Sequence, residues 1–323
     1  MLEHGGRLRR AAETHGIALA DWLDLSTGIN PWGYPVPPVP AEAWLRLPED
    51  DDGLEAAAAR YYGSAELLPV AGSQPAIQAL PAVLPGARVS LLAPGYAEHA
   101  HAWRERRARA VSADEIDAAV ADSDILVLVQ PNNPTGVHFG RARLLEWHAR
   151  LARRGGWLVV DEAFIDTTPA QSLTPLAGSD GLVVLRSLGK FFGLAGARVG
   201  FVFAPAGIRT ALAERLGPWT LAGPARWAAR HALADTPWQD RMRVALEAAG
   251  ARLQALLAQR GLPACGPALF KLVATPEAAR LHDAFARRGI LLRRFDAPQA
   301  LRFGLPPDEA GWERLSAALK ACG

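Results

Sequence analysis

Residues 186–200 read RSLGKFFGLAGARVG, and the lysine within this stretch indicates the kind of fold that carries it. Lys190 is one of three lysines in 323 residues, beside Lys271 and Lys320, and arginine supplies nearly all other cationic side chains. It follows an apolar run at 182–187 and lies in a glycine-rich turn rather than on a helix face. Unlike arginine, lysine can lose its proton and attack a carbonyl group. We therefore expect Lys190 to serve chemistry rather than surface charge.

The composition is that of a globular chain long enough for two lobes. Half of the residues are hydrophobic, 21% are charged, and the net charge is +2. Interspersed charges give no basic patch for nucleic acid, and no apolar run approaches the ~20 residues that span a bilayer. The first 16 residues contain no signal-peptide-like apolar segment, and Cys265 and Cys322 form no CxxC pair. We expect a cytoplasmic protein that binds neither nucleic acid nor membrane, with Cys265 as a small core residue.

The middle of the chain alternates apolar, β-rich runs with helical patterns at 97–108 and 141–154. Strands that are apolar throughout and separated by helices indicate a parallel or mixed sheet covered on both faces. We therefore predict an α/β fold with a mostly parallel sheet flanked by helices. The expected strands are RVSLLA (88–93), DILVLVQ (124–130), GWLVVDE (156–162), LVVLRS (182–187) and RVGFVFA (198–204).

The rest of the chain predicts a smaller lobe. A helical stretch rich in alanine and leucine runs from about 222 to 260, before Gly261 and Pro263. Three short β-rich runs and two helical patterns follow, which indicates an α+β domain. The proline-dense beginning is typical of an irregular arm. We expect an arm at 1–40, a large domain at 41–220, and a long helix with a small domain at 221–323; the three runs are 269–274, 290–295 and 300–305.

Unusual polar residues follow the strand ends, where α/β sheets bind ligands. The turn PNNPTG (131–136) follows the second run, Asp161 ends the third, and Ser187 and Lys190 end the fourth. Arg198 opens the fifth run. Upstream, Gly72, Ser73 and Gln74 precede a helical pattern, whose free N–H groups and dipole would bind an anion.

These parts suit one cofactor, pyridoxal 5'-phosphate, which requires a Schiff-base lysine and an acid at its ring nitrogen. Lys190 would bind the aldehyde, Asp161 the ring nitrogen and Asn133 the ring hydroxyl. Tyr96, at another strand end, would stack on the ring. Taken singly, each residue has an ordinary interpretation as surface charge, helix cap, loop or core. Five compatible groups at successive strand ends favour the cofactor, with its phosphate on Gly72, Ser73, Gln74, Ser187 and Arg198.

Two other kinds of site are disfavoured. No GxGxxG opens the first strand–helix unit, and the GK at 189–190 lacks the upstream glycine of a P-loop. His99 and His101 form the one close histidine pair, but residues two apart on a helix do not share a face. We expect no metal site.

PNNPTG, DEAF (161–164) and SLGKFFGLAGARVG together resemble the class I and II aminotransferases, which are fold-type I pyridoxal phosphate enzymes. Within that group the chain is similar to histidinol-phosphate aminotransferases and to the threonine-phosphate decarboxylases of cobalamin synthesis. The opening HGG (4–6), DLSTGINP (24–31) and LRSLGKFF favour the decarboxylases. So does Phe164, because the aminotransferases carry a tyrosine there. A second departure is Leu47 in RLPE, where they often have a tyrosine that reaches the neighbouring subunit's cofactor.

The resemblance implies decarboxylation of L-threonine O-3-phosphate to (R)-1-amino-2-propanol O-2-phosphate by a homodimer. Lys190 and Asp161 would be the catalytic residues, with Arg302 holding the substrate carboxylate. The other implied substrate contacts are His4, Gly5, Gly28, Asn133 and Arg293.

Two alternatives stay open from the sequence. The first is an aminotransferase that acts on histidinol phosphate or a related donor and requires 2-oxoglutarate. The second is an amine-sensing regulator of the same fold, which would carry a DNA-binding domain. An arm of ~40 proline-rich residues is too short for a typical helix-turn-helix domain, so the enzyme is favoured.

Overall fold

The computed structural model describes residues 4–322, and the chain divides into two compact units. The large unit comprises residues 33–133 and 137–241. The small unit contains the described residues up to Trp32, the three residues Pro134–Gly136, and the described residues from Met242 onward. These units differ from the expected segments in three respects. The first part of the arm groups with the carboxyl-terminal segment, Pro134–Gly136 belong to the small unit, and the change of unit falls at 241–242 instead of 220–221.

The large unit contains a seven-stranded mixed sheet of order β2-β8-β7-β6-β5-β3-β4. Strands β3 to β7 pair in parallel, whereas β8 runs antiparallel to both β7 and β2. All five strands expected from the apolar runs are present, and β2 and β4 are additional. The strands are β2 (Leu67–Val70), β3 (Val89–Leu92), β4 (Arg109–Val111), β5 (Ile125–Val129), β6 (Trp157–Asp161), β7 (Leu182–Ser187) and β8 (Gly200–Phe203).

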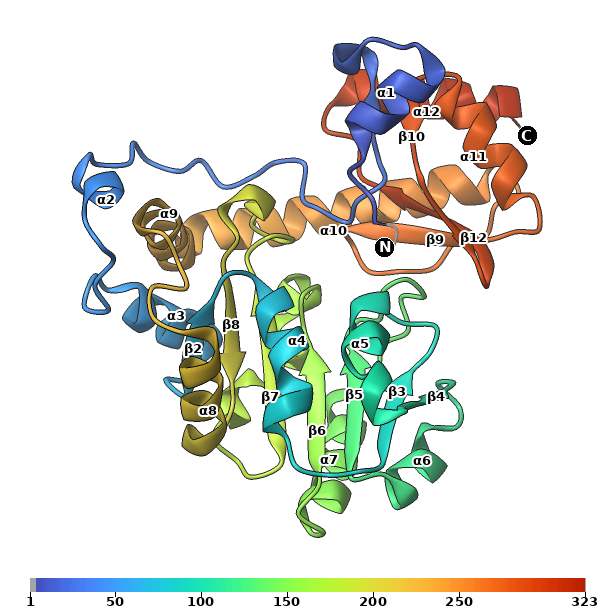
Figure 1. The fold of residues 1–323 in the computed structure, drawn as a ribbon. Coiled ribbons are helices and arrows are strands. Elements are labelled where there is room, and N and C mark those ends of the chain that lie inside the picture. Colours follow the sequence, from blue (N-terminus) through green and yellow to red (C-terminus); the bar gives the residue numbers. More distant parts are fainter. Residues whose placement is uncertain (1–3, 323) are drawn as a thin grey trace. The chain divides into compact units, whose positions relative to one another are not determined.

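Helices cover both faces of this sheet (Figure 1). On one face, alternate strand residues such as Val127, Val159 and Leu185 join residues of α4 and α8 in one buried cluster. On the other face, α7 packs on β6. The helices of the large unit are α2 (Glu42–Leu45), α3 (Leu54–Tyr62), α4 (Ser73–Val83), α5 (Ala97–Ala102), α6 (Ile116–Asp122), α7 (Arg141–Ala152), α8 (Ala206–Leu216) and α9 (Gly223–Ala234).

The small unit holds a three-stranded antiparallel sheet, β11-β12-β9, and a short parallel pair, β1-β10. Helix α1 packs Leu8 and Ala12 against Trp22, Ala286 and Leu291. Helices and strands of the small unit are α1 (Leu8–His15), β1 (Leu23–Asp24), β9 (Phe270–Ala274), α11 (Ala278–Ala286), β10 (Ile290–Leu291), β11 (Arg293–Asp296), β12 (Gln299–Gly304) and α12 (Glu309–Cys322).

The single helical stretch expected at 222–260 is two helices, α9 and α10 (Thr236–Ala258). Asp235 separates them in a non-helical conformation (φ −90°, ψ 75°), and its carboxylate accepts the N–H of Trp238 at 3.0 Å. A proline follows at 237, where the first turn of a helix needs no N–H donor. An Asp-x-Pro sequence therefore starts a new helix inside an otherwise continuous pattern.

Candidate active site

The amino-terminal end of α4 is the candidate anion-binding position. Gly72 precedes the helix with φ +74°, no side chain caps the first turn, and no acidic residue lies in it. The guanidinium of Arg198 lies beside this glycine: a Cβ on Gly72 would be 2.6 Å from Nη2. Unpaired N–H groups, the positive end of the helix dipole and a guanidinium together suit a phosphate. The structure thus brings Gly72, Ser73 and Arg198 together.

The pairing of β7 with β8 brings Ser187 to the same end of α4. Ser187 is the last residue of β7 and pairs with Gly200 of β8. A Cβ on Gly200 would be 2.9 Å from the backbone nitrogen of Ser73, so only glycine allows this close approach. The side chain of Gln74 points to a different partner, since its amide donates to Glu98 Oε2 at 2.7 Å. Any contact of Gln74 with the anion would therefore come from its backbone.

Asp161 ends β6 as a buried carboxylate, 3% exposed. Its Oδ1 accepts the N–H of Ala163 at 3.1 Å, and its Oδ2 lies 3.0 Å from Nε2 of His99 on α5. Nδ1 of His99 is buried without a hydrogen-bond partner among the described residues. A proton on Nδ1 would therefore be costly, so the neutral imidazole carries its proton on Nε2 and donates it to Asp161.

Lys190 and Phe164 face each other. Phe164 follows β6, which ends at Asp161, and Lys190 follows β7, which ends at Ser187. The Lys190 ammonium lies 5.6 Å from the centre of the Phe164 ring, which is 3% exposed. A tyrosine hydroxyl at 164, as in the aminotransferases, is absent. Tyr96 is half-buried and its ring contacts His99 edge-on at 6.1 Å, whereas Asn133 is half-buried in the turn after β5.

The residues of the large unit fit pyridoxal phosphate. The cradle at Gly72 and Arg198 suits its phosphate, and the buried Asp161–His99 pair suits a protonated ring nitrogen. Lys190 supplies an amine at the end of the neighbouring strand. Among residues 4–322, no group of three or more histidine, cysteine or carboxylate side chains is close enough to hold a metal ion.

The small unit brings its predicted residues together around Ser26. The guanidinium of Arg302, only 7% exposed, donates to the carbonyl oxygen of Ser26 at 2.9 Å. The hydroxyl of Ser26 accepts the N–H of Gly6 at 2.7 Å. A Cβ on Gly5 would lie 2.3 Å from the Ser26 carbonyl oxygen, which explains why the HGG segment needs glycine there. Gly28 is buried two residues further along the same segment.

Arg302 also lies directly opposite Arg293 in the β11–β12 pair. Residues opposite each other share a face of the sheet, so both arginine side chains project from the same face. A cavity of about 250 Å³ in the same unit is lined by His4, Gly5 and Arg293, and by further cationic residues such as Arg10; Arg302 does not line it. Such a cavity suits an anionic ligand with several charges.

His99 was not predicted as a site residue. Its sequence context suggested only one half of a metal-binding pair with His101. The expectation that the two histidines differ in orientation is correct: His99 is buried and His101 is exposed. The expectation for Cys265 is wrong, because it is exposed and its thiol donates to the Thr135 carbonyl at 3.2 Å.

Residues 47–319 match the family described as aminotransferase class I and II. The chain belongs to this family. Within the aminotransferase class I and II family, it is 57% identical to a threonine-phosphate decarboxylase from Pseudomonas aeruginosa, over 99% of this chain and 97% of the relative. A threonine-phosphate decarboxylase from Sinorhizobium sp is 42% identical over 98% of this chain and 97% of its own. A histidinol-phosphate aminotransferase from Methylobacillus flagellatus is 31% identical over 59% and 54% of the two chains.

Solved structures agree with the fold of this family. One is a histidinol-phosphate aminotransferase from Sinorhizobium meliloti in complex with pyridoxal-5'-phosphate. It superposes with a TM-score of 0.83 at 21% identity, over 100% of this chain and 98% of its own. The L-threonine-O-3-phosphate decarboxylase from Porphyromonas gingivalis gives 0.76 at 19% identity, covering 92% of this chain and 98% of its own. The predicted fold class and the predicted family are confirmed. No helix within residues 4–322 is long and apolar enough to cross a membrane.

Proposed function

We propose that this chain decarboxylates L-threonine O-3-phosphate to (R)-1-amino-2-propanol O-2-phosphate for cobalamin biosynthesis, with pyridoxal 5'-phosphate as cofactor. The observation that carries the proposal is the Arg293–Arg302 pair beside the HGG segment in the small unit. It offers two fixed cations to a substrate with one carboxylate and one phosphate. The 57% identity to a decarboxylase over nearly the whole chain supports the same reaction.

The large unit would hold the cofactor. Gly72, Ser73, Ser187 and Arg198 would bind its phosphate, and the Asp161 carboxylate would keep a proton on its ring nitrogen. When bound, pyridoxal phosphate supplies the electron sink for the bond broken at the substrate α-carbon. Tyr96 and Asn133 would stack on the ring and bind its hydroxyl, with Gln74 contributing its backbone N–H. These roles rest on the contacts above and on the resemblance.

Lys190 would bind the cofactor aldehyde and would be the amine that returns a proton to the substrate α-carbon, because the other two lysines, Lys271 and Lys320, belong to the small unit. Arg302 would orient the carboxylate by a bidentate contact. His4, Gly5 and Arg293 would bind the phosphate, with Gly28 in the adjoining segment. By holding the carboxylate in one orientation, Arg302 would determine which bond at the substrate α-carbon breaks.

The competing function is an aminotransferase that uses histidinol phosphate or a related donor. Phe164 favours decarboxylation, because it removes the hydroxyl that the aminotransferases place near the cofactor ring. The test is turnover of O-phospho-L-threonine by the pyridoxal-phosphate-loaded protein without a keto acid. Release of carbon dioxide with aminopropanol phosphate is the expected result. Amino transfer from histidinol phosphate that requires 2-oxoglutarate, without carbon dioxide release, would establish the alternative.

A homodimer is part of this proposal. Four large apolar side chains of the large unit are exposed: Trp44 (69%), Leu45 (83%), Leu47 (64%) and Trp219 (59%). Exposed apolar groups of this size favour burial in an interface. Leu47 cannot donate a hydrogen bond, so a dimer would use apolar contact where the aminotransferases place a tyrosine. Light scattering of the purified protein tests whether it is a dimer. We also propose that the enzyme acts in the cytoplasm.

A further inference from the structure

The two strand ends that carry Asp161 and Ser187 also carry a second pair of residues, on the opposite face of the sheet. Asp161 pairs with Leu185 in the β6–β7 register. Because side chains alternate along a strand, Asp161 and Ser187 share one face, whereas Glu162 and Arg186 share the other. The backbone hydrogen bonds between β6 and β7 continue to Glu162, whose N–H donates to the Leu185 carbonyl at 2.9 Å.

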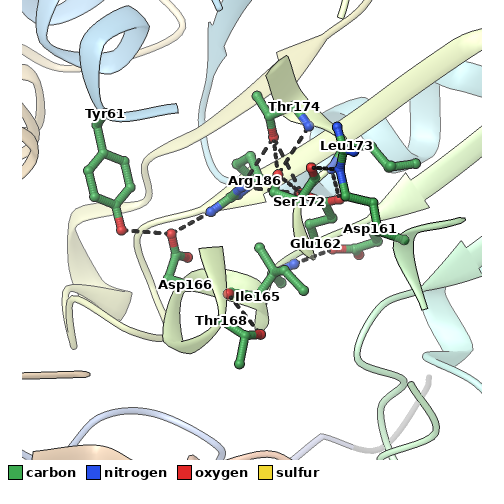
Figure 2. Close-up of polar contacts among 12 residues, drawn as sticks. Tyr61, Asp161, Glu162, Ile165, Asp166, Thr168, Ser172, Leu173, Thr174 and Arg186 are labelled. Atoms are coloured by element: carbon green, nitrogen blue, oxygen red, sulfur yellow. Dashed lines mark hydrogen bonds and ion pairs between the residues drawn. The ribbon is translucent and has the colours of Figure 1, made fainter. Parts of the chain in front are cut away.

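Arg186 and Glu162 join the two strands by their side chains at this point (Figure 2). Nη1 of Arg186 lies 3.2 Å from Glu162 Oε2, and its Nη2 pairs with Asp166 in the segment after β6. Arg186 is 2% exposed and both carboxylates are fully buried. One guanidinium fork therefore links β7 to two successive points of the segment that continues from Asp161.

Further contacts fix this network in place. Glu162 Oε1 accepts the N–H of Leu173 at 2.8 Å, and Arg186 Nη1 contacts the hydroxyls of Ser172 and Thr174 at 2.9 and 3.1 Å. At its outer end, the Tyr61 hydroxyl donates to Asp166 at 2.9 Å. The donors and acceptors come from three separate segments, so the network defines one geometry at these strand ends.

Stability alone gives little reason for such a network. Replacing a buried ion cluster by uncharged residues of similar size is often neutral or stabilising, since desolvation offsets the attraction. What a planar guanidinium between two carboxylates does provide is a fixed distance and orientation. The positions that it fixes are the residues adjoining Asp161 and Ser187.

We propose that Arg186 is a positioning residue of the cofactor site, which acts through Glu162 and Asp166 to set the separation of Asp161 from Ser187. Asp161 would bind one end of pyridoxal phosphate and Ser187 the other, so an error in this separation weakens both contacts. The inference rests on the proposed cofactor site and not on the choice of substrate.

The test compares cofactor binding and folding in two variants. Arg186→Lys keeps the charge but cannot reach both carboxylates with a planar fork. The triple variant Glu162→Gln/Asp166→Asn/Arg186→Met removes all charges, and we expect it to fold with a Tm near that of the wild type. In both, we expect the Kd for pyridoxal phosphate, titrated by absorbance, to rise about 10-fold or more, since the loss of one hydrogen bond to a charged group weakens binding about 10- to 100-fold. The visible circular dichroism of the bound cofactor should change as well.

A matched cluster in the same unit provides the control. Arg226 on α9 is 4% exposed and binds Asp52 at 2.8 Å and Glu55 of α3 at 2.8 Å. Within the described residues it contacts neither Asp161 nor Ser187 in any hydrogen bond or ion pair. Asp52→Asn/Glu55→Gln/Arg226→Met should leave the Kd for pyridoxal phosphate within about 2-fold of the wild type. Wild-type affinity and dichroism in the Arg186 triple variant would overturn the proposal, as would an equal loss of affinity in the Arg226 control.

Discussion

Arg293 and Arg302 lie directly opposite each other on β11 and β12, and the ring of Phe295 lies 5.1 and 5.9 Å from their guanidinium carbons. Two cationic side chains on one face of a sheet suit an anionic ligand. We therefore expect Arg293→Gln to reduce the rise in Tm that O-phospho-L-threonine produces and to raise the KM for this substrate about 10- to 100-fold. The latter corresponds to the roughly 1.5–3 kcal/mol of a hydrogen bond to a charged group.

Thermal unfolding with and without substrate, together with steady-state kinetics, checks this expectation. Arg287→Gln is a suitable control, because Arg287 is an exposed residue on the surface next to α11, where it pairs with Asp283 at 2.8 Å. It should change neither quantity by more than a small amount. An unchanged KM in the Arg293 variant would remove the substrate phosphate from this strand pair.

Lys190→Ala should abolish both the absorbance of bound pyridoxal phosphate in its lysine-linked form and all turnover. The reason is that Lys190 is the one lysine of the large unit, since Lys271 and Lys320 belong to the small unit. Lys320→Ala is the control, since this exposed lysine on α12 should be replaceable without loss of either signal. Turnover by the Lys190 variant at the wild-type rate would refute the assignment.

The strand ends that form the large part of the site could be predicted from the sequence for a physical reason. Strands buried on both faces are apolar throughout, so polar residues such as Asp161 mark where each strand leaves the core. β8 could be recognised in the same way. The two-residue strand β1 could not, because a periodicity needs more residues than this strand has, and the single run expected at 290–295 is divided into β10 and β11.

His99 and Arg186 could not be assigned, for different reasons. His99 contacts Asp161 across 62 positions, and no local pattern states which histidine of the HxH pair faces the sheet. Arg186 and Glu162 were visible as neighbours of predicted site residues. Their partners Ser172 and Thr174, however, come from an irregular segment whose path depends on tertiary packing.

A carboxylate at the opposite end of the sheet should make stability depend on acid pH. Hydrogen bonds from the Arg88 side chain, and then from the Arg88 and Ala87 backbone, lower the pKa of Asp124 from 3.8 to about 2. A lowered pKa means that the stabilisation is complete above pH 4 and is lost as the pH falls toward 2. Because the Asp124 side chain is 29% exposed, Asp124→Asn should cost about 1 kcal/mol at pH 7.

Unfolding by denaturant between pH 2 and pH 7 measures this contribution. The free energy of unfolding of the wild type should fall more steeply below pH 4 than that of Asp124→Asn, so that the two curves converge toward pH 2. Parallel curves over this range would show that Asp124 titrates alike in the folded and unfolded chains.

The buried contact between His99 and Asp161 should affect kcat and the absorbance of the bound cofactor. His99→Phe keeps a ring of similar size but removes the donor 3.0 Å from Oδ2, so Asp161 is left with fewer hydrogen bonds. We expect kcat to fall about 10- to 100-fold, the range for one hydrogen bond to a charged group. The pH dependence of the bound cofactor's absorbance should shift too, because Asp161 would hold the ring-nitrogen proton. His101→Phe, an exposed position on the same helix, should leave both unchanged. A loss of stability in His99→Phe with normal kcat and an unshifted absorbance profile would mean that His99 only fills the core.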